Sequence, residues 1–174
     1  PWEWKYVLIE PNPSCHAHLR QLAREQLSHH GRPAKVIPRA AWISNGTRRL
    51  YGAQNGLAAV GASLKQGHNG GVASRKGAQF ITVSTFDLGQ FLLGLFSRRS
   101  RRPAPCVVMK MDIEGAETTV LPHLLRGGAI RNLKALYVEW HSRYLALRER
   151  QKTEVREAAI INSLKSLTLL RQWH

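Results

Sequence analysis

Three carboxylates follow directly on an apolar run in the stretch 107–117, at Asp112, Glu114 and Glu117. Residues 106–111 are almost wholly apolar, which predicts a strand of a parallel sheet that is covered on both faces. Asp112 falls where this strand would leave the sheet. A carboxylate at the end of a buried strand needs a partner or a chemical role, so Asp112 is a candidate functional residue.

A helix is predicted directly after these acids, because apolar residues recur at helical spacing and two glycines follow them. The apolar positions are Ala116, Val120, Leu121, Leu124 and Leu125, and the glycines are Gly127 and Gly128. Gly115 allows a sharp turn before the helix. We therefore expect Asp112 and Glu114 in the turn between strand and helix, where ligands bind in open α/β sheets. For Glu117 we expect only a stabilising position near the positive N-terminal end of the helix.

Another predicted strand also ends in an acid. A β-rich run at 5–9 leads to Glu10, and Pro11 and Pro13 stop the strand before Ser14, which we expect to cap the next helix. In nucleotide-binding folds, an acid at such a strand end accepts hydrogen bonds from the ribose hydroxyls. Glu10 is therefore a candidate ligand for a nucleoside.

A third predicted strand, at 133–140, places Glu139 and His141 at its carboxyl end. A histidine in this position is suited to act as a general base near neutral pH. It is equally suited to hydrogen-bond a neighbouring loop. The sequence does not choose between these two roles.

Shorter patterns predict the elements between these strands. A short strand at 35–38 is followed by an Asn-Gly step at 45–46, which is typical of a hairpin with 50–51 on the returning strand. Residues 52–77 are rich in glycine, serine, asparagine and lysine, and predict a long irregular segment. A β-like run at 80–84 leads into residues 85–87, which open an apolar helix.

The C-terminal part predicts one more helix and one more strand. The helix covers 153–167, with Val155, Ala159, Ile160 and Leu164 facing inward, and the strand falls within 167–173. Strands thus alternate with helices along a chain of 174 residues. This alternation predicts a single α/β domain over residues 1–174 with a largely parallel sheet.

The composition limits the classes of partner. A net charge of +15 favours anionic partners without proving nucleic-acid binding. We interpret the arginine-rich run 98–103 as a solvated loop, so a nucleic-acid contact there is not favoured. No apolar run has membrane-spanning length and no signal-peptide pattern is present. The chain looks like a fragment of a longer one that would carry any targeting signal, so the location is unknown, with the cytoplasm as the default expectation.

Cysteine and histidine do not form a metal-binding pattern in the sequence. Cys15 and Cys106 are far apart and offer neither a disulfide framework nor a zinc-finger spacing. The histidines at 16, 18, 29 and 30 lack a carboxylate or a second pair at ligand spacing, so surface positions are favoured for them. We therefore assign no metal ligands in the favoured interpretation.

Four segments together resemble the FkbM family of S-adenosylmethionine-dependent methyltransferases. In chain order they are Ile9-Glu10-Pro11-Asn12-Pro13, Thr85-Phe86-Asp87, Met109-Lys110-Met111-Asp112-Ile113-Glu114-Gly115-Ala116-Glu117 and Tyr137-Val138-Glu139-Trp140-His141. Their order and spacing agree with the family over nearly the whole chain. The resemblance implies a Rossmann-like class I methyltransferase fold, which is a three-layer α/β sandwich with a mostly parallel sheet.

The resemblance also implies site residues and a reaction. The cofactor-binding residues would be Glu10, Pro11, Asn12, Ala41, Trp42, Asp112 and Glu114, and the catalytic residues Asp112, Glu139 and His141. Glu10 would hold the ribose of S-adenosylmethionine, and Ala41 and Trp42 would lie near the adenine. The implied reaction is methyl transfer to a hydroxyl of a sugar or small metabolite, with Asp112 or His141 as the base.

The chain departs from the family pattern at its N-terminus. Class I methyltransferases begin with a central strand and a glycine loop that wraps the methionine part of the cofactor, and neither precedes Glu10 in this sequence. We therefore expect an N-terminally incomplete domain, in which the strands that end at Glu10 and Asp112 keep unpaired edges. Weak or absent cofactor binding by residues 1–174 alone follows from that expectation.

Two other functions compete with methyl transfer. One is a non-catalytic basic module that contacts an anionic partner through residues 98–102, which would show steeply salt-dependent binding. The other is a metal-assisted hydrolase in which Asp112, Glu114, Glu139 and His141 hold a divalent cation. We rank the methyltransferase first, chiefly because of the resemblance.

Overall fold

Strands and helices alternate along the computed structural model, which describes residues 4–25, 27, 34–53, 61–66, 79–97, 106–145 and 147–173. The elements are β1 (Val7–Ile9), α1 (Pro13–Glu25), β2 (Lys35–Ile37), β3 (Ala40–Trp42), β4 (Gly46–Tyr51), β5 (Phe80–Asp87), α2 (Leu88–Phe96), β6 (Val107–Met111), α3 (Glu117–Arg126), η3 (Ala129–Asn132), β7 (Leu133–Glu139), η4 (Ser142–Tyr144), α4 (Leu147–Lys165) and β8 (Leu169–Trp173). The predicted arginine-rich loop at 98–103 and most of the irregular segment 52–77 lie outside the described residues. None of the described helices is long and apolar enough to cross a membrane.

The described strands form three hydrogen-bonded sheets. β1 pairs in parallel with β2, β6 and β8 flank β7 in parallel, and β5 lies between β3 and β4. Only the β4–β5 pair is antiparallel among these strands. The mixed α/β class with parallel pairing is therefore confirmed. The three-layer sandwich stays a prediction, because β1 and β6 belong to separate sheets. Each of the two has a partner on one side only among the described strands, which agrees with the expected unpaired edges.

The predicted hairpin around the Asn-Gly step at 45–46 is wrong. β3 and β4 do not pair with each other, because β5 lies between them and pairs with both. The connection is held to the end of β5, where the Asn45 side chain accepts a hydrogen bond from the backbone N–H of Asp87 and the Ser44 carbonyl accepts one from the Thr85 hydroxyl. The turn therefore passes around the carboxyl end of β5, a strand that comes about 40 residues later.

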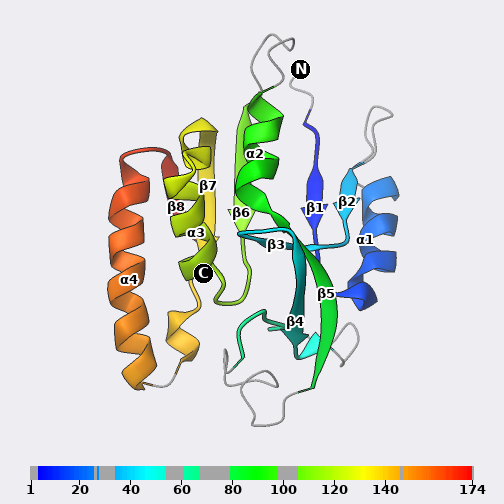
Figure 1. The fold of residues 1–174 in the computed structure, drawn as a ribbon. Helices are drawn as coiled ribbons and strands as arrows, with labels where there is room; N and C mark the ends of the chain where they lie inside the picture. The colour runs from blue at the N-terminus through cyan, green and yellow to red at the C-terminus, as the bar shows by residue number, and fades with distance from the viewer. Residues whose placement is uncertain are drawn as a thin grey trace.

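Strand β6 is covered on one face, which corrects the prediction of a strand covered on both. Val107, Met109 and Met111 pack against the main core, whereas Val108 is 44% exposed and Lys110 is also exposed. Figure 1 shows α2 and α3 over one side of β6 and β7. The strand is therefore a half-buried one with alternating faces, and its nearly continuous apolar sequence concealed this alternation.

Helix α3 begins and ends where the sequence predicts. It follows the Asp112–Gly115 turn and stops at Arg126, and Gly128 adopts the left-handed conformation with φ of 74°. Its inner face packs into the main core together with α2, β6, β7 and α4. The helix is also tied to α2, because His123 Nε2 lies 2.9 Å from Oδ1 of Asp87, the residue that caps α2.

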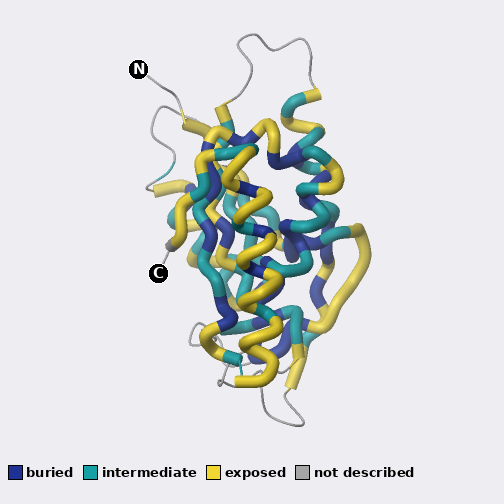
Figure 2. The backbone as a smooth tube through the Cα atoms, turned by 90° about the vertical axis from the view of Figure 1, so that its left-hand side faces the viewer, coloured by how far each residue is buried: buried dark blue, intermediate teal, exposed yellow. Residues whose placement is uncertain are grey.

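The inward face of α4 differs from the predicted one. Ile160 and Leu164 are buried as expected, but Val155 and Ala159 are exposed and Glu157 is buried instead. The Glu157 carboxylate accepts a 2.6 Å hydrogen bond from the Ser142 hydroxyl, which satisfies a charge on the apolar side of the helix. Figure 2 views this helix from outside, and most of its turns carry exposed residues.

Removal of a core side chain from α3 tests this packing. Leu124 is fully buried, so Leu124→Ala is expected to lower the free energy of unfolding by about 2–5 kcal/mol through lost burial and a residual cavity. Leu147 of α4 is 72% exposed and serves as the matched control, with an expected change within about 0.5 kcal/mol. Denaturant unfolding measures both, and equal effects would contradict the described core.

Candidate functional site

The turn between β6 and α3 carries the two acids of the predicted site in an unusual backbone conformation. Glu114 is the only described non-glycine residue with positive φ, at 52°, and Gly115 follows at 89°. Such a conformation is uncommon for a residue with a side chain and requires support from its surroundings. The Ser63 hydroxyl gives that support by donating a 2.7 Å hydrogen bond to the Glu114 carbonyl. The expected sharp turn at Gly115 is therefore observed.

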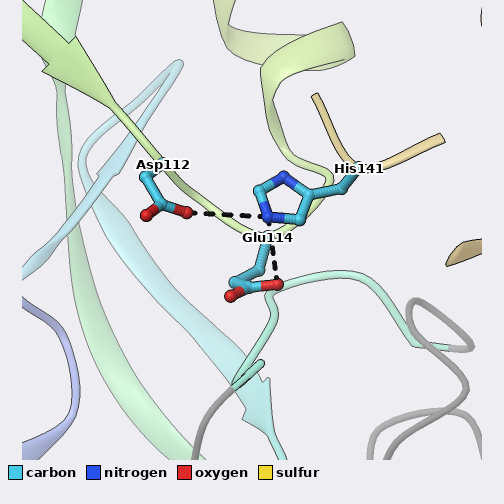
Figure 3. Close-up of side chains that lie close together, drawn as sticks. All are labelled: Asp112, Glu114 and His141. Carbon is cyan, nitrogen blue, oxygen red and sulfur yellow. Dashed lines mark ion pairs between the residues drawn. The ribbon is translucent and has the colours of Figure 1, made fainter. Parts of the chain in front are cut away.

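His141 faces both acids from the end of the neighbouring strand. Its Nε2 lies 3.6 Å from Oδ1 of Asp112 and 3.3 Å from Oε2 of Glu114, and Figure 3 shows both carboxylates directed at this one nitrogen. The parallel pairing of β6 and β7 explains the proximity, because it places the carboxyl ends of the two strands side by side. The structure thus brings together three of the predicted site residues.

Glu117 is more than a helix-terminal charge, which corrects the expectation for it. Its side chain is 1% exposed, and Oε1 accepts hydrogen bonds from the backbone N–H of Ile113 and from Nδ1 of His141, each at 3.0 Å. One carboxylate oxygen thereby joins the acidic turn to the histidine. The sequence held a signal for this burial, since Glu117 shares the i, i+3, i+4 and i+7 spacing of the apolar face with Val120, Leu121 and Leu124.

The surrounding carboxylates determine the charge of His141. Burial alone would lower the pKa of its imidazole, but the hydrogen bond to Glu117 and the negative charges of Glu117, Glu114 and Asp112 raise this pKa above the ordinary 6.5. Burial also raises the pKa of the Glu114 carboxyl, against the lowering effect of His141. Positive charge is therefore favoured at the point where these side chains meet.

Glu139 is the last residue of β7, two positions before His141, but it is not one of the three residues of this cluster. Its Oε1 accepts a 3.2 Å hydrogen bond from the Arg143 guanidinium, one turn further along the chain. It is absent from the three-residue group in which ligand atoms lie within 4.8 Å of one another among the described residues. The predicted catalytic role of Glu139 therefore stays a prediction.

Glu10 lies at the end of β1 and is held by its own loop. Its Oε1 accepts a 2.7 Å hydrogen bond from the backbone N–H of buried Asn12, and burial raises the pKa of its carboxyl. The Asn12 side chain in turn accepts a hydrogen bond from the Ser14 N–H, so Asn12 caps α1 and the predicted cap at Ser14 is wrong. The physical reason is Pro13, which lacks an N–H and fits the first position of a helix.

Ala41 and Trp42 lie in β3 as buried residues. The Trp42 ring belongs to the main core, and the Arg48 guanidinium lies over it at 4.3 Å from its centroid. Its Nε1 is buried without a hydrogen-bond partner among the described residues. Ile9 and Met111, which directly precede Glu10 and Asp112, pack against the same core. A shared core thus holds the ends of β1, β3 and β6 in one part of the molecule.

Lys65 is a site neighbour that the sequence did not reveal. Its ammonium donates a 2.7 Å hydrogen bond to the Thr118 hydroxyl in the first turn of α3. Burial lowers the pKa of this ammonium, and the negative charge of Glu117 offsets only part of that effect. Lys65 and Ser63 both come from the part of the chain that was predicted to be irregular. No local pattern marks them, because their partners are more than 50 positions away.

The fold and the site together define a class of protein. Strands β1, β6 and β7 point in the same direction in Figure 1. An acid follows β1 and β6, and an acid ends β7 with a histidine two residues beyond it, as in α/β enzymes that bind a ligand beyond the strand ends. The model of the methyltransferase FkbM domain matches residues 1–158. The chain therefore belongs to the FkbM methyltransferase family. No curated protein and no solved structure gives a significant match.

The pH dependence of stability tests the Glu117–His141 contact. Because the folded-state pKa of His141 is raised, its stabilising contribution is fully present below pH 6.5 and is lost as pH rises through the raised value. Glu117→Gln removes the negative charge, so it should lower the free energy of unfolding by about 1 kcal/mol more near pH 6 than near pH 9. The reason is that the bond to His141 is charge-assisted near pH 6 and neutral near pH 9.

Denaturant unfolding at the two pH values measures this difference. Glu25→Gln is the matched control, because Glu25 is an exposed acid of α1 that contacts Gln21. Its effect should stay within about 0.5 kcal/mol at both pH values. A Glu117→Gln cost that is the same at both pH values, or larger at the higher one, would contradict a raised pKa for His141.

Proposed function

We propose that this methyltransferase transfers the methyl group of S-adenosylmethionine to a hydroxyl of a sugar or another small metabolite. The observation that carries the proposal is the position of ionisable side chains directly beyond strands with parallel pairing: Glu10 after β1, and Asp112 in contact with His141 after β6 and β7. Family membership supplies the reaction class. The strand-end groups support a nucleoside cofactor beside a reacting hydroxyl.

Glu10 is proposed to hold the cofactor ribose. A carboxylate accepts hydrogen bonds from two neighbouring hydroxyls, and the Asn12 N–H and the adjacent Pro11 fix the Glu10 carboxylate at the strand end. Ala41 and Trp42 are proposed for the adenine side, since their strand ends against the same core. These roles place the nucleoside across the ends of β1 and β3.

The reacting end of the cofactor is assigned to Asp112 and Glu114. The sulfonium and the amino group of S-adenosylmethionine are positive, and two carboxylates in a partly buried turn complement that charge. The net charge of the chain is opposite, at +15. The acidic turn is therefore a local exception in a basic protein, which suits a cationic ligand.

The reaction is an in-line displacement. A bond forms between the acceptor oxygen and the methyl carbon while the sulfur–methyl bond breaks, and S-adenosylhomocysteine leaves with the electron pair. The hydroxyl proton passes to Asp112 or His141. Asp112 is the more accessible of the two, because its side chain is 36% exposed and that of His141 is 3% exposed. His141 would then act mainly by holding Asp112 and Glu114 in place.

Calorimetric titration with S-adenosylmethionine tests the cofactor site. The titration uses residues 1–174 and, because an N-terminally incomplete domain is expected from the sequence, also an extended protein that supplies the expected upstream strand and glycine loop. Glu10→Ala should weaken binding by about 10-fold or more, because hydrogen bonds to a charged group contribute about 1.5–3 kcal/mol.

The control for this titration is Glu25→Ala, which removes a carboxylate from the exposed side of α1 and should leave the affinity unchanged. Circular dichroism shows that each variant is folded. A folded extended protein that does not bind S-adenosylmethionine would overturn the methyl-transfer proposal. Equal affinities of Glu10→Ala and the unmodified protein would remove Glu10 from the cofactor site and leave the reaction class standing.

A further inference from the structure

We propose that Asp112, Glu114 and His141 form a binding site for a divalent first-row transition-metal ion. One ligand atom from each residue lies within 4.8 Å of the other two, and this is a set of two carboxylate oxygens and one imidazole nitrogen. Carboxylates and imidazole are the side chains that bind such ions most often outside thiolate sites. Figure 3 shows the two carboxylates approaching the same ring nitrogen from different directions.

The spacing of the ligand atoms fits a coordination sphere. Metal–nitrogen and metal–oxygen bonds are about 2.0–2.2 Å long, so neighbouring ligand atoms are about 3 Å apart in octahedral and about 3.4 Å apart in tetrahedral coordination. Nε2 of His141 lies 3.3 Å from the Glu114 oxygen and 3.6 Å from the Asp112 oxygen. The two carboxylate oxygens lie within 4.8 Å of each other, so an ion at Nε2 would draw them together.

An independent observation is the hydrogen bond made by the second ring nitrogen of His141. Nδ1 of His141 is hydrogen-bonded at 3.0 Å to Glu117, a carboxylate that is 1% exposed and lies outside the three ligands. Metal-binding histidines usually have such a carboxylate on their second nitrogen, because it fixes the ring orientation and the tautomer. Glu117 thus directs Nε2 toward Asp112 and Glu114, as a metal site requires.

The site is accessible from solvent on its carboxylate side. The Asp112 side chain is 36% exposed and that of Glu114 is 23% exposed, whereas His141 closes the inner side. Lys110 Nζ contacts Oδ2 of Asp112, and Oδ1 is the oxygen that faces His141. Three protein ligands on one side leave coordination positions for an oxygen of another molecule, as in catalytic metal sites.

A bound ion would also have a use in the proposed reaction. With an ion bound, Asp112, Glu114 and His141 would hold the ion instead of the sulfonium or the hydroxyl proton, and the ion would lower the pKa of a coordinated acceptor hydroxyl and orient it. That use rests on the proposed function, whereas cation binding itself does not. We favour Mn²⁺-like ions over Mg²⁺ and Ca²⁺, since the histidine nitrogen is a poor ligand for the last two.

Titration of Mn²⁺ into residues 1–174 tests the site without any cofactor. Free Mn²⁺ is followed by electron paramagnetic resonance, and one saturable site is expected. Asp112→Asn and His141→Gln should each weaken it by about 10-fold or more, whereas His18→Gln, on the exposed side of α1, should leave it unchanged. Pulsed resonance should detect a coupled imidazole nitrogen in the bound ion, and this signal should disappear in His141→Gln.

The outcomes separate this inference from the cofactor proposal. If His141→Gln fails to fold, Asp112→Asn decides, because this partly exposed position tolerates an amide of the same shape. Lack of saturable Mn²⁺ binding by the folded chain, or binding that Asp112→Asn does not weaken, would overturn the metal site. Mn²⁺ binding by residues 1–174 together with no S-adenosylmethionine binding by the folded extended protein would keep the metal site and reject the cofactor assignment. Cofactor binding by the extended protein without saturable Mn²⁺ binding would keep the cofactor assignment and reject the metal site.

Discussion

The candidate site depends on one buried carboxylate oxygen. Oε1 of Glu117 accepts hydrogen bonds from Ile113 N–H and from His141 Nδ1, and so joins the β6–α3 turn to the end of β7. A buried carboxylate is costly unless it is paired in this way. With both bonds formed, the charge fixes the start of α3, the acidic turn and the orientation of the imidazole, which are the three parts that the site needs.

Local patterns were sufficient to predict the strand ends and their polar residues. Glu10, Asp112, Glu139 and His141 each follow or end a strand, as the apolar runs before them indicate. Non-local pairing was not predictable in this way. β5 lies between β3 and β4 although it pairs with residues about 30 to 45 positions earlier in the chain, and the sequence of the Asn-Gly turn carries no information about that strand. The role of Glu117 was missed because a charge was assumed to lie outside the core, although its spacing placed it on the apolar face.

The site concentrates negative charge in a protein that is otherwise positive. Asp112, Glu114 and Glu117 surround one imidazole, while the whole chain carries +15. A proton on His141, the sulfonium of a cofactor and a divalent ion would each neutralise part of this charge. The two proposals therefore share one physical basis, which is the preference of this turn for a cation. Which cation is bound would determine whether His141 acts as an ion-pair partner or as a ligand.

The most direct test of this account is a nitrogen NMR titration of the His141 side chain in the metal-free protein. If Glu117 holds the imidazole as described, the proton on Nδ1 should remain when the ring becomes neutral, and the titration midpoint should lie above 6.5. A neutral ring that is protonated on Nε2, or a midpoint below 6.5, would show that Glu117 does not orient His141, and the described site would be wrong at its centre.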